Sequence, residues 1–167
     1  MAEQRLIICN TSPMINLAEI CQLELFGSLQ GRVCIPPAVR DELRAKSGLF
    51  PTAAQAVDSR RFPVIAPLDA LLVRGFSASL HRGEAECLAL AMENPGSLLI
   101  LDDLSARAHA SANQLPFTGT LGILAAAKAR GLLPALAPVM RELRTRARFW
   151  ISPSLERFIL EEAGETE

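Results

Sequence analysis

The sequence predicts an α/β fold in which a central parallel sheet of four to five strands lies between two layers of helices. Short apolar, β-rich runs alternate along the chain with longer helical patterns. The run 98–101 is apolar without alternation, which is typical of a strand covered on both faces. Half of the 167 residues are hydrophobic and 21% are charged, so one buried core is expected. We therefore predict a single domain over residues 1–167, with an acidic tail that frays from about residue 160.

Each expected element has a local signal. Strands are predicted at 6–9, 33–35, 64–66, 98–101 and 116–118. Helices are predicted at 13–29, 37–46, 83–93, 103–113, 120–130 and 135–147, and a last helix follows Pro153. Ser12 and Pro13 are expected as the N-cap and first residue of the first helix, because proline lacks only an N–H group that would be unpaired there. Prolines interrupt residues 48–79, where loops or short helices are expected.

Composition and charge exclude several classes of protein. A formal net charge of −1 argues against a general nucleic-acid binder, so contact with a polyanion must be local. The arginine-rich segment 141–148 is the best local candidate, and it also fits a solvated helix end. No apolar run is long enough to cross a bilayer and no signal peptide is evident, so a cytoplasmic protein is expected.

The four cysteines lack metal-site or redox spacing. They stand at positions 9, 21, 34 and 87, three of them among apolar residues, and they are expected to be reduced and packed. The two histidines stand 28 positions apart, which gives a zinc site little to build on. There is no G-x-G-x-x-G and no P-loop motif, so a nucleotide-binding α/β protein is a weak alternative.

Polar residues follow the predicted strands at one edge of the sheet. In doubly wound folds ligands bind beyond the carboxyl ends of the strands. Asn10, Thr11 and Ser12 follow the first strand, Asp102 and Asp103 follow the fourth, and Gly119-Thr120 follows the fifth. Glu42, Glu84 and Glu86 come from neighbouring helices. Carboxylates gathered at one edge repel each other unless protons or a hard cation compensate, so we expect a Mg²⁺ or Mn²⁺ site.

Helix geometry narrows the choice of ligands. Residues two apart on a helix point about 200° apart, so Glu84 and Glu86 cannot both face one ion. We prefer Glu86, with Glu84 as second choice or support. Asp102 and Asp103 differ by about 100°, so one can bind metal while the other caps a helix or holds a water. The sequence leaves open which does which. Each acid also has an ordinary explanation as a helix cap or a solvated helix residue.

Five motifs in this order resemble those of a PIN domain, in a prokaryotic subgroup related to VapC-type toxins. They are LIICNTSP at 6–13, IPPAVRDEL at 35–43, GEAE at 83–86, LDDLSAR at 101–107 and GTLGIL at 119–124. The resemblance covers residues 5 to about 160. It implies a three-layer α/β/α fold and a metal-dependent endoribonuclease that hydrolyses RNA phosphodiester bonds with Mg²⁺ or Mn²⁺.

Carried over by position, the resemblance assigns the family's four acids to an asparagine and to five acidic residues, two of the assignments being left open. The first falls on Asn10, the second on Glu42, the third on Glu86 or Glu84, and the fourth on Asp102 or Asp103. Thr11, Ser12 and Thr120 match polar positions beside the site. An amide in place of an acid removes a charge and predicts weaker metal binding.

The resemblance leaves two functions and several partners open. The chain is expected to be the nuclease itself, as the toxin of a toxin–antitoxin pair with a small antitoxin protein, or a catalytically weak or silent PIN module that binds RNA or a protein. With one tryptophan and no tyrosine, RNA contact is expected to rest on basic residues near the site, with Arg82 and Arg107 as candidates. A homodimer is expected if the Ala- and Leu-rich helices at 121–129 or 132–139 present an apolar face, and burial in the core is the alternative.

Overall fold

The computed structural model describes residues 4–165 and shows a four-stranded parallel sheet. The strand order is β2-β1-β3-β4, and every pair of neighbours is parallel. Central strand β1 pairs Ile8 with Cys34 on one side and with Leu99 on the other. The strands are β1 (Leu6–Cys9), β2 (Arg32–Cys34), β3 (Leu98–Ile100) and β4 (Phe117–Thr118).

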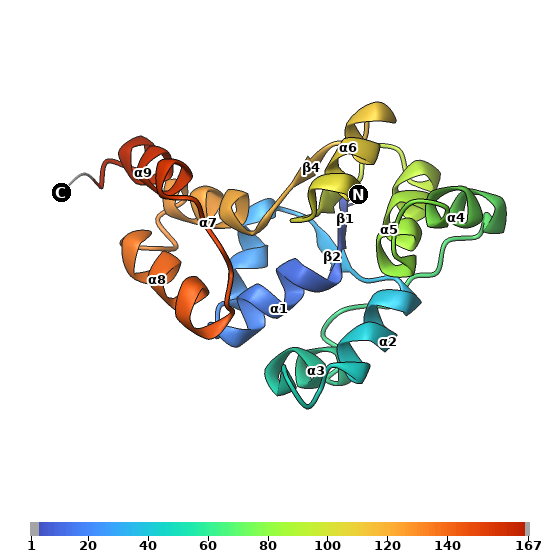
Figure 1. The fold of residues 1–167 in the computed structure, drawn as a ribbon, viewed down its shortest axis with the longest axis horizontal. Coiled ribbons are helices and arrows are strands. Elements are labelled where there is room, and N and C mark those ends of the chain that lie inside the picture. Colours follow the sequence, from blue (N-terminus) through green and yellow to red (C-terminus); the bar gives the residue numbers. More distant parts are fainter. Residues whose placement is uncertain (1–3, 166–167) are drawn as a thin grey trace.

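Helices cover both faces of this sheet, so the predicted three-layer α/β/α architecture is confirmed. Helices α1, α7 and α8 lie on one side, and α4 and α5 lie on the other (Figure 1). The helices are α1 (Thr11–Glu19), the 3-10 helix η1 (Leu23–Leu29), α2 (Pro37–Ala45), α3 (Pro51–Asp58), α4 (Ala70–Ser77), α5 (Arg82–Glu93), α6 (Leu104–Ala112), α7 (Thr120–Ala129), α8 (Ala137–Arg146) and α9 (Pro153–Glu162). None of the helices within residues 4–165 has the length and apolar character needed to cross a membrane.

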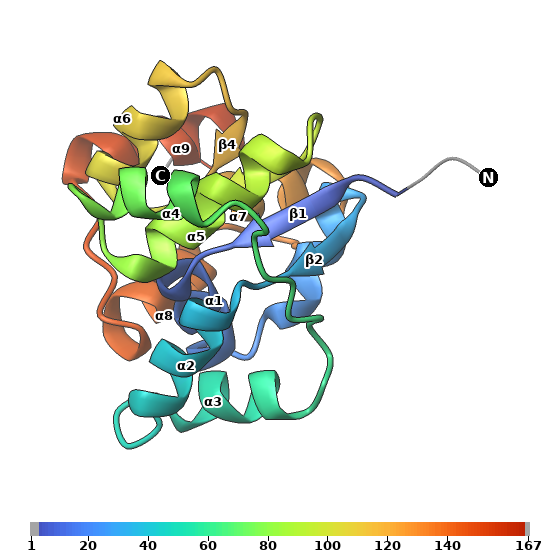
Figure 2. The ribbon, with the colours of Figure 1, turned by 90° about the vertical axis from the view of Figure 1, so that its right-hand side faces the viewer.

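The topology places its switch point between β1 and β3. From β1 the chain moves outward to β2, whereas from β3 it moves in the opposite direction to β4. The connections that leave the carboxyl ends of these two central strands therefore diverge, which opens a crevice at that edge of the sheet. The carboxyl end of β1 points to the side from which Figure 1 is viewed, as the turned view in Figure 2 shows.

Three predicted elements differ from the structure. Residues 64–66 form no strand, and Val64 makes only an isolated bridge to Ile35, because prolines on both sides limit pairing. The helix expected over 13–29 divides into α1 and η1, with Cys21 at a positive φ of 56° between them. Helix α1 begins at Thr11 rather than Pro13, and Asn10, not Ser12, takes the N-cap position without a side-chain cap.

The core accounts for most of the apolar residues that the sequence offered. Cys9, Cys34 and Cys87 are free and fully buried, as predicted, and burial raises the pKa of the Cys34 thiol to about 12. The prediction is wrong for Cys21, which is free but exposed, because it lies in the turn between α1 and η1. The Ala- and Leu-rich helices considered for a dimer bury Ile123, Leu124 and their apolar neighbours in the protein's own core. These helices therefore offer no large apolar face for a dimer, and the homodimer remains a prediction.

The C-terminal segment is more ordered than the predicted tail. Helix α9 continues to Glu162, and the carboxylate of Glu165 accepts hydrogen bonds from the backbone N–H groups of Leu136 and Ala137 at 2.6 and 3.0 Å. Of the acidic tail expected to fray from about residue 160, positions 166–167 lie outside the described residues.

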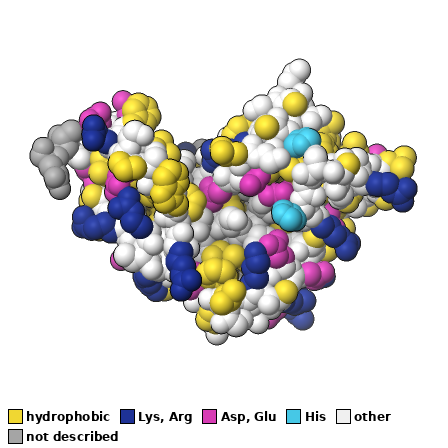
Figure 3. All heavy atoms as spheres, viewed as in Figure 1, with side chains coloured by type: hydrophobic (Ala, Val, Ile, Leu, Met, Phe, Trp, Pro, Cys, Tyr) yellow, Lys and Arg dark blue, Asp and Glu magenta, His cyan; other side chains and the backbone are white. Residues whose placement is uncertain are grey.

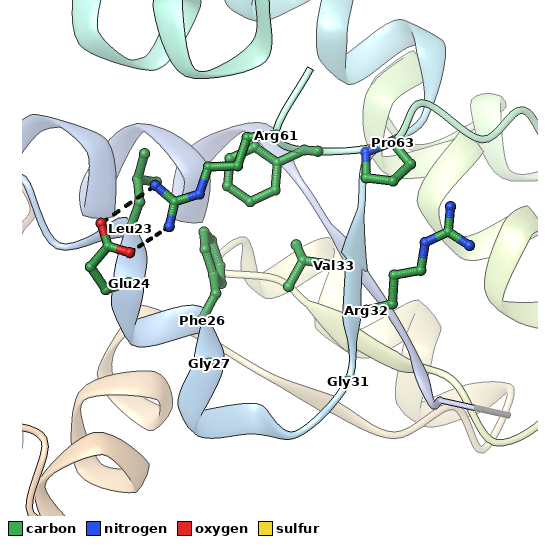
Figure 4. A pocket seen from close by; sticks show the side chains of 10 residues that line it. Leu23, Glu24, Phe26, Gly27, Gly31, Arg32, Val33, Arg61 and Pro63 are labelled. Atoms are coloured by element: carbon green, nitrogen blue, oxygen red, sulfur yellow. Dashed lines mark hydrogen bonds and ion pairs between the residues drawn. The ribbon is translucent and has the colours of Figure 1, made fainter. Parts of the chain in front are cut away.

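A surface hollow of about 490 Å³ lies beside edge strand β2. Its walls include Phe26, Val33 and Pro63, and an ion pair of 2.7 Å between Arg61 and Glu24 closes one side (Figure 4). None of the predicted site residues lines this hollow. The hollow is therefore separate from the acids at the carboxyl ends of the strands.

Candidate metal site at the carboxyl ends of the strands

Acidic side chains gather in a hollowed region at the centre of one face, with histidine side chains beside them (Figure 3). This is the face onto which the carboxyl ends of the strands open (Figures 1 and 2). Two short connections bring the first donors there, because Asn10 directly follows β1 and Asp102 and Asp103 follow β3 within three residues. The parallel sheet thus places residues about 90 positions apart at neighbouring strand ends.

Asn10 offers an amide oxygen that the protein itself does not use. Its backbone N–H donates to the carbonyl of Ile100 at 3.1 Å, which fixes the position of the residue between the two central strands. The residue is only 5% exposed, yet its side chain does not cap α1. Within residues 4–165 we find no hydrogen bond to its Oδ1 or Nδ2. The side-chain amide is not among the fully buried polar atoms that lack a partner, so it reaches the surface, where it is suited to hold a water or a ligand.

Glu42 reaches the site from α2 and is held by two neighbours. Its Oε2 accepts a hydrogen bond from Thr11 Oγ1 at 2.6 Å, and its Oε1 contacts Lys46 Nζ at 2.6 Å. Burial opposes ionisation, but the bonds from Lys46 and Thr11 outweigh it and lower the pKa of Glu42. The carboxylate is therefore ionised and compensated by a lysine in this arrangement.

Gly83 allows the start of α5 to approach these donors. A Cβ at this position would lie 3.4 Å from Glu42 Oε2 and 3.5 Å from Asn10 Oδ1. The two oxygens therefore flank one point on the backbone of α5. A larger residue would place a carbon atom between the amide and the carboxylate.

Glu84 is the acid of the site whose pKa is raised by the charges of other acids. It is 9% exposed, and its Oε2 accepts a hydrogen bond from the backbone N–H of His81 at 3.1 Å. Burial raises the pKa of Glu84, and the negative charges of Asp103 and Glu42 raise it further. Glu84 is thus close enough to Asp103 and to Glu42 to experience the negative charge of each.

Glu86, the acid preferred on sequence grounds, is occupied elsewhere. Its Oε2 accepts a hydrogen bond from the backbone N–H of Ala38 at 2.8 Å, and its Oε1 pairs with Arg82 at 3.0 Å. Ala38 lies in the first turn of α2, where N–H groups lack helical partners. Glu86 therefore fastens α2 to α5, and the structure favours Glu84 as the candidate ligand.

Asp102 and Asp103 divide two roles in the way that their 100° separation allows. Asp102 accepts from the Thr120 backbone N–H at 2.8 Å, from Thr120 Oγ1 at 2.6 Å and from Asn16 Nδ2 at 3.0 Å. Asp103 caps α6 by accepting from the Ala106 N–H at 2.9 Å and is exposed. Asp103 keeps one oxygen free of these contacts, whereas Asp102 is held by three protein hydrogen bonds and by Arg107 at 3.9 Å.

The remaining predicted residues lie at the margin. Arg107 donates to the carbonyl of Leu101 at 2.8 Å and lies over the ring of Phe117, so it is fixed at the strand end. Arg82 is 79% exposed and turned to Glu86. Ser12 is exposed in the first turn of α1 and makes no described hydrogen bond. Thr11 and Thr120 hold Glu42 and Asp102, as their predicted positions beside the site suggest.

Two residues of the site escaped the sequence reasoning. Asn16 is 5% exposed and bonds both Asp102 and Thr120, and its position as a single amide within the apolar stretch of α1 was the available signal. Lys46 pairs with Glu42 one helical turn away, an i,i+4 spacing that is visible in the sequence.

The fold and the acids together define a nuclease-like α/β domain. A family profile described as a PIN domain matches residues 6–165. The chain therefore belongs to the PIN-domain family, which confirms the resemblance seen in the motifs. A search of curated proteins returned no match.

Proposed function

We propose that this PIN domain hydrolyses RNA phosphodiester bonds with the help of Mg²⁺ or Mn²⁺ held by Asn10, Glu42, Glu84 and Asp103. The observation that carries the proposal is the approach of three carboxylates and one free amide oxygen at the switch point of the sheet. Family membership supports a nuclease and a divalent metal in general terms. The RNA substrate, internal cleavage and the choice of residues are our proposal.

The donor set fits a hard divalent cation. All four groups offer oxygen, which Mg²⁺ and Mn²⁺ prefer over nitrogen and sulfur. Burial and the charges of Asp103 and Glu42 raise the pKa of Glu84 despite the opposing effect of His81, so a positive charge would be favourable at this point. A cation would relieve that repulsion and would satisfy the free oxygen of Asn10.

The site is not closed around an ion in this conformation. Across residues 4–165, no three His, Cys, Asp or Glu side chains are arranged so that they could hold one metal ion. Glu42 is turned to Lys46, which supplies the compensating positive charge instead. Cation binding would therefore require rotation of Glu42 and separation of a half-exposed ion pair, a change that costs little because such pairs contribute about 0–1 kcal/mol.

The chain's own residues would prepare the reaction. A bound Mg²⁺ or Mn²⁺ supplies charge stabilisation at the phosphodiester and makes water more acidic. Thr11 orients Glu42 through its hydroxyl group. Asp102 holds the start of α7 and Asn16 against the end of β3, which fixes the backbone that presents Asp103. Asp102, which already holds these protein groups, is thus assigned to positioning rather than to metal binding.

The proposal is tested by measuring cleavage of a labelled single-stranded RNA with Mg²⁺, with Mn²⁺ and with EDTA. We expect metal-dependent cleavage that falls at least about 100-fold in Glu84→Gln and Asp103→Asn, the scale of losing an essential electrostatic group. Asn10→Asp is expected to increase cleavage at low metal concentration. Asp41→Asn serves as a control, because Asp41 adjoins Glu42 in sequence but is 62% exposed and paired with Arg40.

Glu86→Gln decides between the two glutamates of α5. The amide oxygen can still accept the Ala38 N–H, so the variant keeps the contact that joins α2 to α5. Loss of cleavage in Glu86→Gln with retention in Glu84→Gln would reverse our assignment. Absence of metal-dependent cleavage in the wild type, in Asn10→Asp and in every other variant would refute the nuclease.

A second candidate function is a PIN module that binds RNA or a protein without cleaving. The uncharged amide of Asn10 favours it, since the first acid of the site is missing and metal binding is weakened accordingly. A toxin whose acidic site is covered by a small antitoxin protein is a special case of the first function. A short reading frame directly upstream that encodes a binding partner would support that variant.

A further inference from the structure

We propose that a second surface beside the acidic hollow binds single-stranded RNA, with Trp150 stacking on a base and arginines holding the phosphates. We call it the basic wall and define it by Arg141, Arg148 and Trp150. The inference rests on the proposed function, because it names the surface that would deliver the same substrate to the acids.

The connection between α8 and α9, which carries Arg148 and Trp150, lies on the side of the molecule onto which the acids open (Figures 1 and 2). Trp150 belongs to the connection between α8 and α9, drawn in orange-red, which runs along one flank of the face seen in Figure 1. The turned view places this connection on the side to which the carboxyl end of β1 points (Figure 2). Hydrophobic and basic side chains lie on this flank of the acidic region in Figure 3.

Arginines of the basic wall are available to a polyanion. Arg144 is paired with Glu156 at 2.5 Å, and Arg146 lies 3.7 Å from Glu142. Arg141 and Arg148 are exposed, and no acid within residues 4–165 pairs with either. Because the candidate metal site is acidic and the net charge is −1, RNA phosphates need separate cationic side chains to remain near it.

Trp150 presents a stacking surface on an anchored backbone. It is the single tryptophan of the chain and is 80% exposed. On one side Phe149 N–H donates to the Leu143 carbonyl at 3.0 Å, and on the other Ile151 is 3% exposed. A tryptophan on a backbone fixed in this way has only two side-chain torsions to order when a base stacks on it. Trp150 therefore adds base stacking to the basic contacts that composition predicts for RNA.

Single-stranded RNA fits this surface better than a duplex, and the exposed arginines that accompany the indole favour a polyanion over an apolar protein segment. Bases in a duplex have their faces stacked inside the helix, whereas unpaired bases expose them. The nearest exposed aromatic on α9 is Phe158, which is 59% exposed and provides a matched test for a purely apolar contact.

The sole tryptophan makes the test direct. We titrate the wild type with oligo(U) and oligo(A) in EDTA, where cleavage plays no part, and follow intrinsic fluorescence, with anisotropy of labelled RNA in parallel. We expect saturable quenching and about 5- to 150-fold weaker binding in Trp150→Ala, the range that stacking of one base represents. Trp150→Phe should recover part of the affinity, and Phe158→Ala should bind like the wild type.

Arg148 has a closely matched control. Both Arg148 and Arg60 are exposed arginines with a positive φ, 55° and 58° respectively. Arg148→Gln should reduce the slope of log affinity against log salt by about 0.7, the value for one single-strand phosphate contact. Arg60→Gln should leave the slope unchanged. Thermal melting of each variant confirms that the fold is intact.

The outcomes separate this inference from the nuclease. Three results would each overturn the proposal that the basic wall binds single-stranded RNA, whatever the cleavage result. They are absence of quenching, an equal loss of RNA affinity in Phe158→Ala and Trp150→Ala, and equal affinity for duplex and single-stranded RNA. Binding that depends on Trp150 and Arg148 in EDTA, together with no metal-dependent cleavage, would uphold the basic wall and refute the nuclease.

Discussion

Glu84 is a residue at which stability and the proposed chemistry make opposite demands. Its carboxylate is buried and faces Asp103 and Glu42, so its ionised form is disfavoured and its pKa is raised. An acid with a raised pKa in the folded state favours folding while it is protonated, and this advantage is lost as the pH rises through that pKa. At neutral pH the ionised Glu84 therefore costs stability, and a cation would remove the cost.

We accordingly predict that Glu84→Gln stabilises the metal-free protein at pH 7 while it abolishes cleavage. The gain should be about 0.5–2 kcal/mol, the range of single stabilising substitutions, and it should shrink toward zero as the pH falls and the wild-type Glu84 becomes protonated. Urea unfolding of both proteins between pH 4 and 8 measures it. Asp41→Asn is the control, and a destabilised Glu84→Gln at pH 7 would contradict the repulsion.

The choice between Glu84 and Glu86 shows what the sequence could not provide at this scale. Helix periodicity correctly indicates that the two side chains diverge, and both are glutamates in the first turns of α5. What separates them is the backbone N–H of Ala38, which is 48 positions away and engages only Glu86. Such a partner is fixed by how α2 packs on α5, and no local pattern records it.

At the scale of elements, prediction succeeded where local signals and burial agree. Apolar runs bounded by turn residues predicted β1 and β3, and the G-T pair predicted the start of α7. It failed at residues 64–66, whose β propensity is real but whose flanking prolines leave a single bridge. It also failed at the C-terminus, where composition indicates a solvated tail and only tertiary structure supplies the partners of Glu165.

Glu165 provides a prediction about how α8 is held. Burial opposes its ionisation, but bonds from the N–H groups of Ala137 and Leu136 and from Lys128 outweigh it and lower its pKa. Glu165→Gln should cost about 0.3–1 kcal/mol at pH 7, because the variant keeps one acceptor oxygen but loses the second acceptor and the negative charge that faces the start of α8. The loss should vanish as the pH falls through the lowered pKa, because a protonated Glu165 no longer provides the stability. Denaturant unfolding measures it.

Glu162→Gln is the matched control for this experiment. Glu162 ends α9 three residues earlier and is exposed. Equal effects of the two substitutions would mean that the contact of Glu165 with α8 contributes nothing beyond general surface charge.

On the scale of the whole molecule, the net charge of −1 conceals a separation of charge. Acidic side chains gather at the centre of the face onto which the strands open (Figure 3), whereas Arg141 on α8 and Arg148 after it are exposed and pair with no acid within residues 4–165. The first group would select a cation and the second a polyanion. A single α/β domain can therefore combine both because the sheet gathers the strand ends, whereas the last helices remain free to carry a different chemistry.

Asn10→Asp links this arrangement to global stability. A carboxylate at position 10 would add negative charge where Glu42 Oε2 already lies, so the metal-free variant should be less stable than the wild type by about 1 kcal/mol. Under the proposed function Mn²⁺ binds the folded site more tightly in Asn10→Asp than in the wild type, and a ligand at 100 times its dissociation constant contributes about 2.7 kcal/mol. The two proteins should therefore exchange their order of stability as Mn²⁺ is added.

Thermal melting across a Mn²⁺ series, with Ca²⁺ and NaCl as ionic controls, measures the exchange without reference to RNA or cleavage. Glu84→Gln should show a much smaller Mn²⁺ effect than either protein, because it removes a ligand whose charge the ion compensates. If Asn10→Asp and the wild type respond to Mn²⁺ in parallel, position 10 does not contact the ion. If neither responds, the acids at the strand ends repel each other without any cation to bind them, and the silent PIN module becomes the better description.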